Sequence, residues 1–212
     1  MKNILLLLIF IPLITLSACA QGPAITTEKA SSTASSTPSK KETMTGKKII
    51  FVAVPNFRDP ELIIPKNILI SEGAEISIAS LKKGNFVGNE GTTVEADYEL
   101  SEVNPNDFDA MVFVGGPGMS HELENKDLQD LAKKFYQSGK LTAAICVAPA
   151  VLANAGILKD KKATVFPTAK GYLIEAGADY TAQAVTIDGS IITADGPESS
   201  TAFANEIIKY FN

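Results

Sequence analysis

Short apolar, β-branched runs alternate with segments of helical periodicity along most of this chain, and this alternation restricts the fold more than any other feature. Residues 48–54 and 110–114 are typical of strands that are buried on both faces. Residues 123–138 carry apolar side chains on one face, which predicts an amphipathic helix that ends at Gly139. Strands that alternate with helices favour a parallel sheet covered on both faces. The sequence therefore predicts a three-layer α/β domain with a mainly parallel sheet.

The other predicted strands and helices continue this alternation along the chain. A small hairpin is expected within residues 82–99, because glycines there separate short alternating segments. Helices are expected at 61–72, 147–154 and 197–211, and strands at 75–80, 141–145, 163–166, 183–187 and 190–194.

The first 46 residues have a different character. Residues 4–16 are a short, almost wholly apolar run, typical of a signal peptide, which we assign to 1–18. The sequence Leu16-Ser17-Ala18-Cys19 resembles a bacterial lipobox, so we expect lipid on Cys19. Residues 24–46 contain eleven Ser or Thr, which predicts a disordered tether over 19–46 and a folded domain over 47–212. The domain would then be extracytoplasmic and lipid-anchored to a bacterial membrane; the alternative is an ordinary signal peptide followed by a chance cysteine.

Charge and composition exclude several kinds of site. The formal net charge is -5, which offers no basic surface for nucleic acid. The chain has one His and two Cys, too few for an ordinary zinc site built from these ligands. No metal or other cofactor is expected.

Cys146 is the strongest candidate for chemistry. It lies between a predicted buried strand and a predicted helix, a junction that places a nucleophile on a sharp turn above the sheet. A helix N-terminus favours a thiolate, so we expect the thiol to titrate below neutrality. The N–H of Val147 and a second N–H from Gly115 or Gly116 are candidate oxyanion donors. The alternative is a structural cysteine buried in an apolar segment.

Several segments between residue 47 and the C-terminus resemble the DJ-1/PfpI family. The resemblance rests on the first strand, on Asp59-Pro60-Glu61-Leu62, on Phe108-Asp109-Ala110 with the following glycine pair, and on Ala144-Ile145-Cys146-Val147-Ala148-Pro149. It implies a flavodoxin-like sandwich with a nucleophile elbow, in a homodimer or larger homo-oligomer. It also implies that Glu61 hydrogen-bonds the Cys146 thiol and that Gly116 and Val147 supply the backbone N–H pair. A carboxyl group beside a thiolate should be partly protonated.

Two positions depart from the family pattern. Protease-like members place a His directly after the nucleophile, where this chain has Val147, and deglycase-like members supply a His at the position of Phe166. His121, in a loop beyond the glycine pair, is the remaining candidate for an accessory imidazole. Without a family His, a cysteine peptidase is the least favoured function.

Two functions remain open. The first is an enzyme or sensor whose Cys146 reacts with small electrophiles of the glyoxal type or with oxidants, assisted by Glu61. The second is a non-catalytic member of the same fold that binds a ligand or partner.

Overall fold

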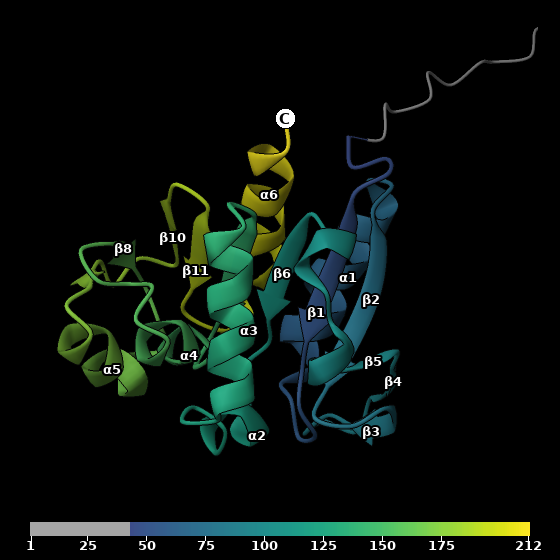
Figure 1. Cartoon of the computed structure of the whole chain (residues 1–212), viewed down its shortest axis with the longest axis horizontal. Helices are drawn as coiled ribbons and strands as arrows, with labels where there is room; N and C mark the ends of the chain where they lie inside the picture. Colours follow the sequence, from purple (N-terminus) through teal and green to yellow (C-terminus); the bar gives the residue numbers. More distant parts are fainter. Residues whose placement is uncertain (1–42) are drawn as a thin grey trace, which may run out of the picture. The chain divides into compact units, whose positions relative to one another are not determined.

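Seven strands form the central sheet, in the order β10-β11-β7-β6-β1-β2-β5 (Figure 1). The computed structural model of the chain describes residues 43–212, which belong to one compact unit. Every neighbouring pair in this sheet is parallel except β10 and β11, which form an antiparallel hairpin. The strands are β1 (Lys48–Val52), β2 (Glu75–Ser80), β5 (Tyr98–Glu99), β6 (Ala110–Phe113), β7 (Leu141–Ile145), β10 (Val185–Asp188) and β11 (Ile191–Ala194).

Helices cover both faces of the sheet. Helices α1 (Asp59–Ser71) and α6 (Ser200–Tyr210) pack against each other, and α3 (Lys126–Gln137) packs against α4 (Pro149–Asn154). Figure 1 shows α3 and α4 in front of the sheet, with α1 and α6 behind it. Short helices α2 (Pro117–Ser120) and α5 (Lys170–Glu175) lie in connections, as do the single 3-10 turns at Leu100–Glu102, Pro105–Asp107, Pro167–Ala169 and Pro197–Ser199. The prediction of a three-layer α/β sandwich with a mainly parallel sheet is confirmed.

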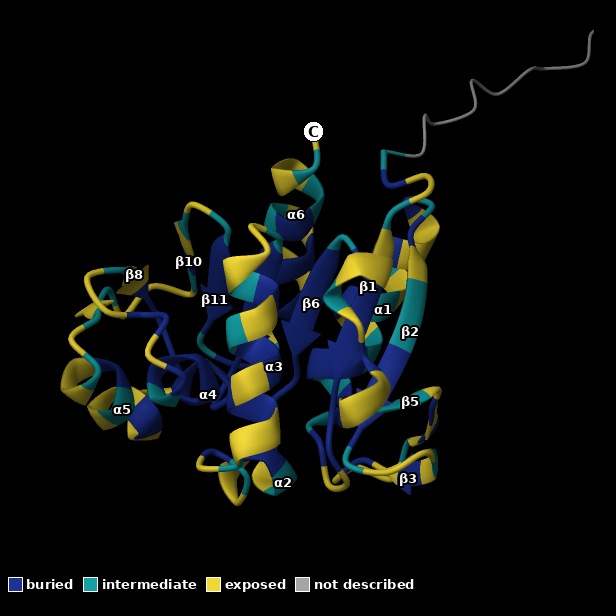
Figure 2. Ribbon diagram, in the orientation of Figure 1, coloured by how far each residue is buried: buried dark blue, intermediate teal, exposed yellow. Residues whose placement is uncertain are grey.

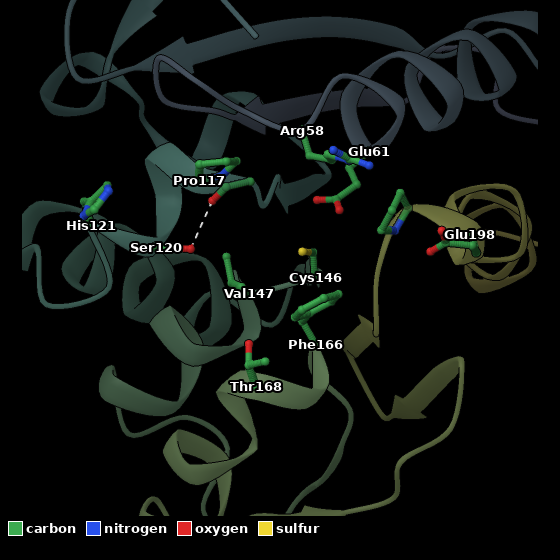
Figure 3. A pocket seen from close by; sticks show the side chains of 12 residues that line it. Arg58, Glu61, Pro117, Ser120, His121, Cys146, Val147, Phe166, Thr168 and Glu198 are labelled. Carbon is green, nitrogen blue, oxygen red and sulfur yellow. Dashed lines mark hydrogen bonds between the residues drawn. The ribbon is translucent and has the colours of Figure 1, made fainter. Parts of the chain in front are cut away.

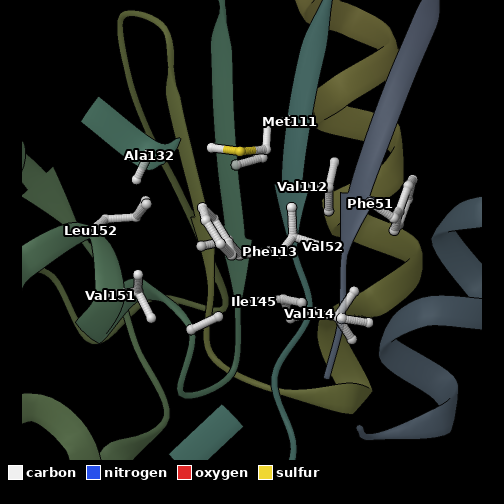
Figure 4. Close-up of a cluster of buried hydrophobic side chains, with 14 of the residues drawn as sticks. Phe51, Val52, Met111, Val112, Phe113, Val114, Ala132, Ile145, Val151 and Leu152 are labelled. Carbon is white, nitrogen blue, oxygen red and sulfur yellow. The ribbon is translucent and has the colours of Figure 1, made fainter. Parts of the chain in front are cut away.

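The core lies between the sheet and its two helical layers. Strands β6 and β7 are buried along their whole length, because helices cover both of their faces (Figure 2). Figure 4 shows Phe113 and Met111 of β6 among side chains from neighbouring strands and from α3 and α4. The outward faces of the helices are exposed, as the periodicity of residues 123–138 predicts.

The region from residue 162 to 182 differs most from the prediction. The strand expected over 163–166 is only β8 (Lys162–Ala163), which pairs with β9 (Asp179–Tyr180) outside the main sheet. Pro167, directly after the expected strand, has no N–H and cannot continue a ladder of backbone hydrogen bonds. The Phe166 N–H donates to the Cys146 carbonyl at 2.8 Å instead of to a neighbouring strand. The hairpin expected within 82–99 is present as β3 (Gly84–Val87) and β4 (Thr93–Ala96).

The ordered domain begins before residue 47. Met44 is fully buried, and its N–H donates to the Glu72 carbonyl at 2.7 Å. Residues 43–46, assigned to the tether by composition, therefore pack on the domain, because a single apolar side chain finds a site beside the end of α1. The signal peptide predicted at 1–18, lipidation at Cys19 and the rest of the tether lie outside the described residues. Within residues 43–212, no helix has the length and apolar character needed to span a bilayer.

Candidate active site

Cys146 follows the last residue of β7 and has a backbone conformation that residues other than glycine rarely adopt. Its φ angle is +64°, in the left-handed region. Neighbours hold this turn from both sides, because the Cys146 N–H donates to the Ala194 carbonyl at 2.9 Å and the Cys146 carbonyl accepts from Phe166. Such conformations persist where the surrounding structure enforces them, often at functional sites. The turn places the side chain at the carboxyl edge of the sheet, before α4 begins at Pro149.

Gly115, just beyond the end of β6, allows the groups of the site to come together. A Cβ atom at this position would lie 2.6 Å from the Cys146 Cβ and 2.6 Å from the Glu61 Oε2. No side chain fits in that space, so only glycine lets the two strand ends and the first helix converge here.

Glu61 reaches the same point from the first turn of α1. The start of α1 is fixed by Asp59, whose carboxylate accepts the N–H groups of Glu90 and Thr92 at 2.9 and 2.8 Å. The Glu61 side chain is fully buried, and its Oε2 accepts the Gly115 N–H at 3.1 Å. Its Oε1 has no partner of full hydrogen-bond geometry among the described residues, although the nearby Cys146 thiol interacts with the carboxyl group. The structure thus brings Glu61 and Cys146 together.

Burial makes both groups of this pair difficult to ionise. Desolvation raises the pKa of Glu61 to about 7, although interactions with Cys146, with the Gly115 N–H and with Arg58 lower it. Desolvation and the charge of Glu61 raise the pKa of Cys146 to about 12, although the N–H groups of Val147 and Gly116 lower it. The prediction of a thiol that titrates below neutrality is therefore not supported. The helix that follows Cys146 has only six residues, and its dipole does not offset burial beside a carboxylate.

A cavity of about 630 Å³ opens beside the thiol (Figure 3). Cys146 lines this cavity although the residue is only 7% exposed. The residues that line the cavity are Arg58, Glu61, Gly116, Pro117, Ser120, His121, Cys146, Val147, Phe166, Thr168, Pro197 and Glu198.

The other predicted site residues occupy different positions around this cavity. The Gly115 N–H donates to the Glu61 carboxyl group, so it is not an oxyanion donor. The N–H groups of Gly116 and Val147 instead interact with the Cys146 sulfur and lower the pKa of its thiol. His121 is exposed at the edge of the cavity, with its ring well away from Cys146 (Figure 3). Residues 43–212 contain no cluster of three or more His, Cys, Asp or Glu side chains that could hold a metal ion.

Sequence reasoning missed several lining residues, namely Arg58, Ser120, Thr168 and Glu198. Arg58 was the easiest to find, because it lies three positions before Glu61. Thr168 and Glu198 each follow a proline, but only the three-dimensional structure shows that their segments meet at Cys146, through the Phe166 N–H and the Ala194 carbonyl.

Known proteins share both the sequence pattern and the fold. Residues 47–210 match the DJ-1/PfpI family profile. An uncharacterized protein of Methanocaldococcus jannaschii is 41% identical over 174 residues, which cover 80% of this chain and 85% of that protein. Deglycase PfpI of Pyrococcus furiosus is 36% identical over 162 residues, which cover 76% of this chain and 98% of the relative.

Solved structures agree with these sequence matches. A ThiJ/PfpI domain protein from Brachyspira murdochii superposes with a TM-score of 0.77 at 34% identity, over 79% of this chain and 98% of that one. DJ-1beta of Drosophila melanogaster gives a TM-score of 0.72 at 30% identity, over 79% of this chain and 91% of that one. With a profile match over most of its length and relatives well above 30% identity, this chain belongs to the DJ-1/PfpI family.

Proposed function

We propose that this chain is a cysteine-dependent enzyme that acts on small α-oxoaldehydes such as glyoxal and methylglyoxal. The observation that carries the proposal is the Cys146–Glu61 pair, held by a strained turn and a close glycine at the end of a cavity. The relatives named deglycases support the same reaction class, since they match nearly their whole length to this chain.

The pair contains the groups that addition to an aldehyde requires. Between pH 7 and 12 the two raised pKa values leave one proton on the pair, with Glu61 as the base and Cys146 as the acid. As the sulfur attacks the aldehyde carbon, an S–C bond forms, the carbonyl electron pair moves to oxygen and the thiol proton moves to Glu61. The N–H groups of Gly116 and Val147 favour the negative charge that develops on sulfur as the proton leaves. Return of the proton to oxygen gives a neutral hemithioacetal.

The same carboxylate can complete the conversion. Glu61 removes the proton from the carbon bound to sulfur, and the electron pair of that C–H bond moves toward the neighbouring carbonyl, whose oxygen becomes negative in an enediolate. The proton of the hydroxyl group on the sulfur-bearing carbon passes to that oxygen, and Glu61 returns its own proton to the neighbouring carbon, which gives an α-hydroxy thioester. Water then hydrolyses the thioester to an α-hydroxy acid and the free thiol. The net reaction adds one water to the oxoaldehyde and needs no imidazole, which suits a site whose nearest His is at the cavity edge.

The second candidate is a non-catalytic member that uses the cavity to bind a ligand or partner. It is favoured by the low exposure of Cys146 and by burial that raises the pKa of the thiol. Oxidant sensing is a variant of the first candidate, in which peroxide converts the thiol to sulfenic acid and releases water.

The test is turnover of methylglyoxal by the purified protein in a buffer without thiols. We expect loss of the oxoaldehyde with matching formation of lactate. Cys146→Ser should abolish turnover, and Glu61→Gln should lower it by roughly 10²- to 10⁴-fold, the usual contribution of a general base. Glu95→Gln, an exposed carboxylate on β4, is the matched control and should leave the rate unchanged. If the wild-type rate equals that of Cys146→Ser, the proposal is wrong and the binding candidate stands.

A further inference from the structure

The wall of the cavity around the thiol is mainly carbon. Phe166 is 37% exposed although it is a large aromatic residue, and Figure 3 shows its ring close to the Cys146 side chain. Val147 lies on the other side of the sulfur, and Pro117 and Pro197 also line the cavity. Exposure of an apolar side chain to water in a cavity is unfavourable, and a ligand with a matching apolar surface removes that exposure.

The backbone of Phe166 is held beside Cys146. The Phe166 N–H donates to the Cys146 carbonyl at 2.8 Å, and Pro167 follows in a 3-10 turn. A Cβ at Gly196 would lie 3.4 Å from the ring Cδ2, so the ring edge faces the β11–α6 connection. The backbone contact to Cys146 therefore places the partly exposed ring beside the nucleophile, where a ligand can pack on it.

The charged groups of the cavity disfavour an anionic ligand. Glu61 and Glu198 both line it, and the charge of Glu198 raises the pKa of Glu61, so the two carboxyl groups act on each other. Arg58 is the one Lys or Arg among the lining residues, and its guanidinium is paired with Glu90 at 3.2 Å. A ligand carboxylate or phosphate would therefore meet two carboxyl groups and a guanidinium that already has a partner.

We propose that Phe166 is a specificity-determining residue and that the site selects α-oxoaldehydes with a neutral aromatic substituent over those with a methyl or an anionic group. The aldehyde carbon would meet the sulfur while the aromatic ring stacks on Phe166. This inference deepens the proposed function and rests on it. Aromatic pairs contribute about 0.5–1.5 kcal/mol beyond their buried area, which corresponds to a preference of about two- to tenfold.

The test compares alkylation of Cys146 by three α-bromo carbonyl compounds. 2-Bromoacetophenone, bromoacetone and bromopyruvate share the reacting group but carry a phenyl, a methyl and a carboxylate substituent. In each case the sulfur forms a bond to the CH₂ carbon, bromide leaves with the electron pair, and the thiol proton passes to Glu61 and then to water. Each rate is divided by the rate with N-acetylcysteine, which removes differences in intrinsic reactivity.

We expect the order phenyl, methyl, carboxylate in the wild-type protein. Phe166→Ala should lower the phenyl-to-methyl ratio by about two- to tenfold, and Phe166→Leu should give an intermediate ratio and keep the fold, checked by circular dichroism. Ile174→Ala is the matched control, since Ile174 is an exposed apolar residue of α5 outside the cavity lining. A phenyl-to-methyl ratio that is the same in wild type, Phe166→Ala and Phe166→Leu would overturn the inference.

A second measurement separates failure of the inference from failure of the proposed function. Binding of acetophenone and acetone to Cys146→Ser is followed by saturation-transfer NMR, which needs no reaction at sulfur. If the protein turns over no oxoaldehyde but acetophenone binds in a Phe166-dependent way, the proposed function fails and the aromatic site stands. If turnover occurs but acetophenone binding does not depend on Phe166, the inference is wrong and the proposed function stands.

Discussion

Cys146 and Glu61 resist ionisation for a common reason, because each is buried and each would be an anion beside the other. Their raised pKa values, about 12 and about 7, leave a single proton on the pair at mildly alkaline pH. The pair is thus set up for proton transfer between sulfur and carboxylate rather than for a permanent thiolate. A substrate that draws electrons from sulfur would move the proton to Glu61 as the new bond forms.

The first prediction concerns the pH dependence of thiol reactivity. The rate of Cys146 alkylation by iodoacetamide should rise through pH 7 in the wild-type protein, because ionised Glu61 can then accept the thiol proton. Glu61→Gln should lose this rise and react at least about tenfold more slowly at pH 8, since even a weak general base contributes more than that. Glu95→Gln should behave as wild type. Identical profiles for wild type and Glu61→Gln would show that Glu61 does not assist the thiol.

The second prediction concerns stability. Because the pKa of Glu61 is raised from 4.5 to about 7, the folded state binds more protons than the unfolded state between these values. The stabilisation is complete below pH 4.5 and is lost as pH rises through 7, and its full size is about 3 kcal/mol. Glu61→Gln cannot titrate, so its free energy of unfolding, measured by urea denaturation, should fall less than that of wild type between pH 5 and 8. Equal pH dependence in the two proteins would contradict the raised pKa.

At the scale of elements, the end of β6 controls how closely the site packs. Gly115→Ala should destabilise the protein by about 1–3 kcal/mol, the usual cost of overpacking, and should abolish the reactivity of Cys146 at neutral pH. The reason is that the new methyl would lie within 2.6 Å of both Cys146 and Glu61. The measurements are chemical denaturation and the rate of alkylation.

Gly171→Ala is the control for that substitution. Gly171 lies in α5, and no other part of the fold comes within 4 Å of the position that an alanine methyl would take, so this substitution should be neutral or slightly stabilising. If Gly115→Ala were as stable and as reactive as Gly171→Ala, the close packing at β6 would not be required for the site.

The sequence predicts some elements well, for identifiable physical reasons. The bounds of β2 and β7 match the prediction, because β7 is a short and almost wholly apolar segment and β2 carries Ile76 and Ile78 at the spacing of a strand. Around residue 165 the prediction of a strand fails. Val165 is apolar because it packs in the core, and the neighbouring Phe166 N–H bonds the Cys146 carbonyl instead of a strand of the sheet. Helix α5 was missed because Lys170–Glu175 is too short to show a helical period.

In the candidate site, the residues are predictable from the sequence but their pKa values and contacts are not. Cys146 and Glu61 are predictable because a turn after a buried strand and a family motif mark them in the sequence. The raised pKa of the thiol is not, because it depends on how deeply the sulfur is buried and on its distance from a carboxylate 85 positions earlier in the chain. The Gly115 hydrogen bond to Glu61 depends on the same convergence of distant segments.

At the scale of the whole molecule, the N-terminal boundary of the domain can be tested by two deletions. Removal of residues 20–42 should leave the melting temperature unchanged, because composition predicts a disordered tether there. Removal of 20–46 also takes away buried Met44 and should lower the melting temperature by roughly 5 °C or more, given a cost of about 2–5 kcal/mol for loss of a buried Met side chain. Equal melting temperatures for the two variants would show that Met44 contributes nothing to stability.

The predicted lipid anchor has its own test. If Cys19 carries lipid, the wild-type protein expressed in a bacterium should incorporate labelled fatty acid and fractionate with membranes. Cys19→Ala should lose the label and accumulate as a precursor or as released protein, while Cys146→Ala should keep the label. Unchanged fractionation and labelling of Cys19→Ala would show that the anchor is not at this residue.

The arrangement of the sheet also determines when the site can form. Glu61, Gly115, Cys146 and Phe166 meet only after the parallel neighbours β1, β6 and β7 have paired and β11 has joined them. Parallel pairing of distant segments closes long loops, which makes formation of these contacts slow. A nascent or partly folded chain therefore holds an ordinary cysteine, with the reactivity of any unfolded thiol. The distinctive pH profile of Cys146 would appear only once these strands have paired, so the reactivity of this thiol reports on assembly of the sheet.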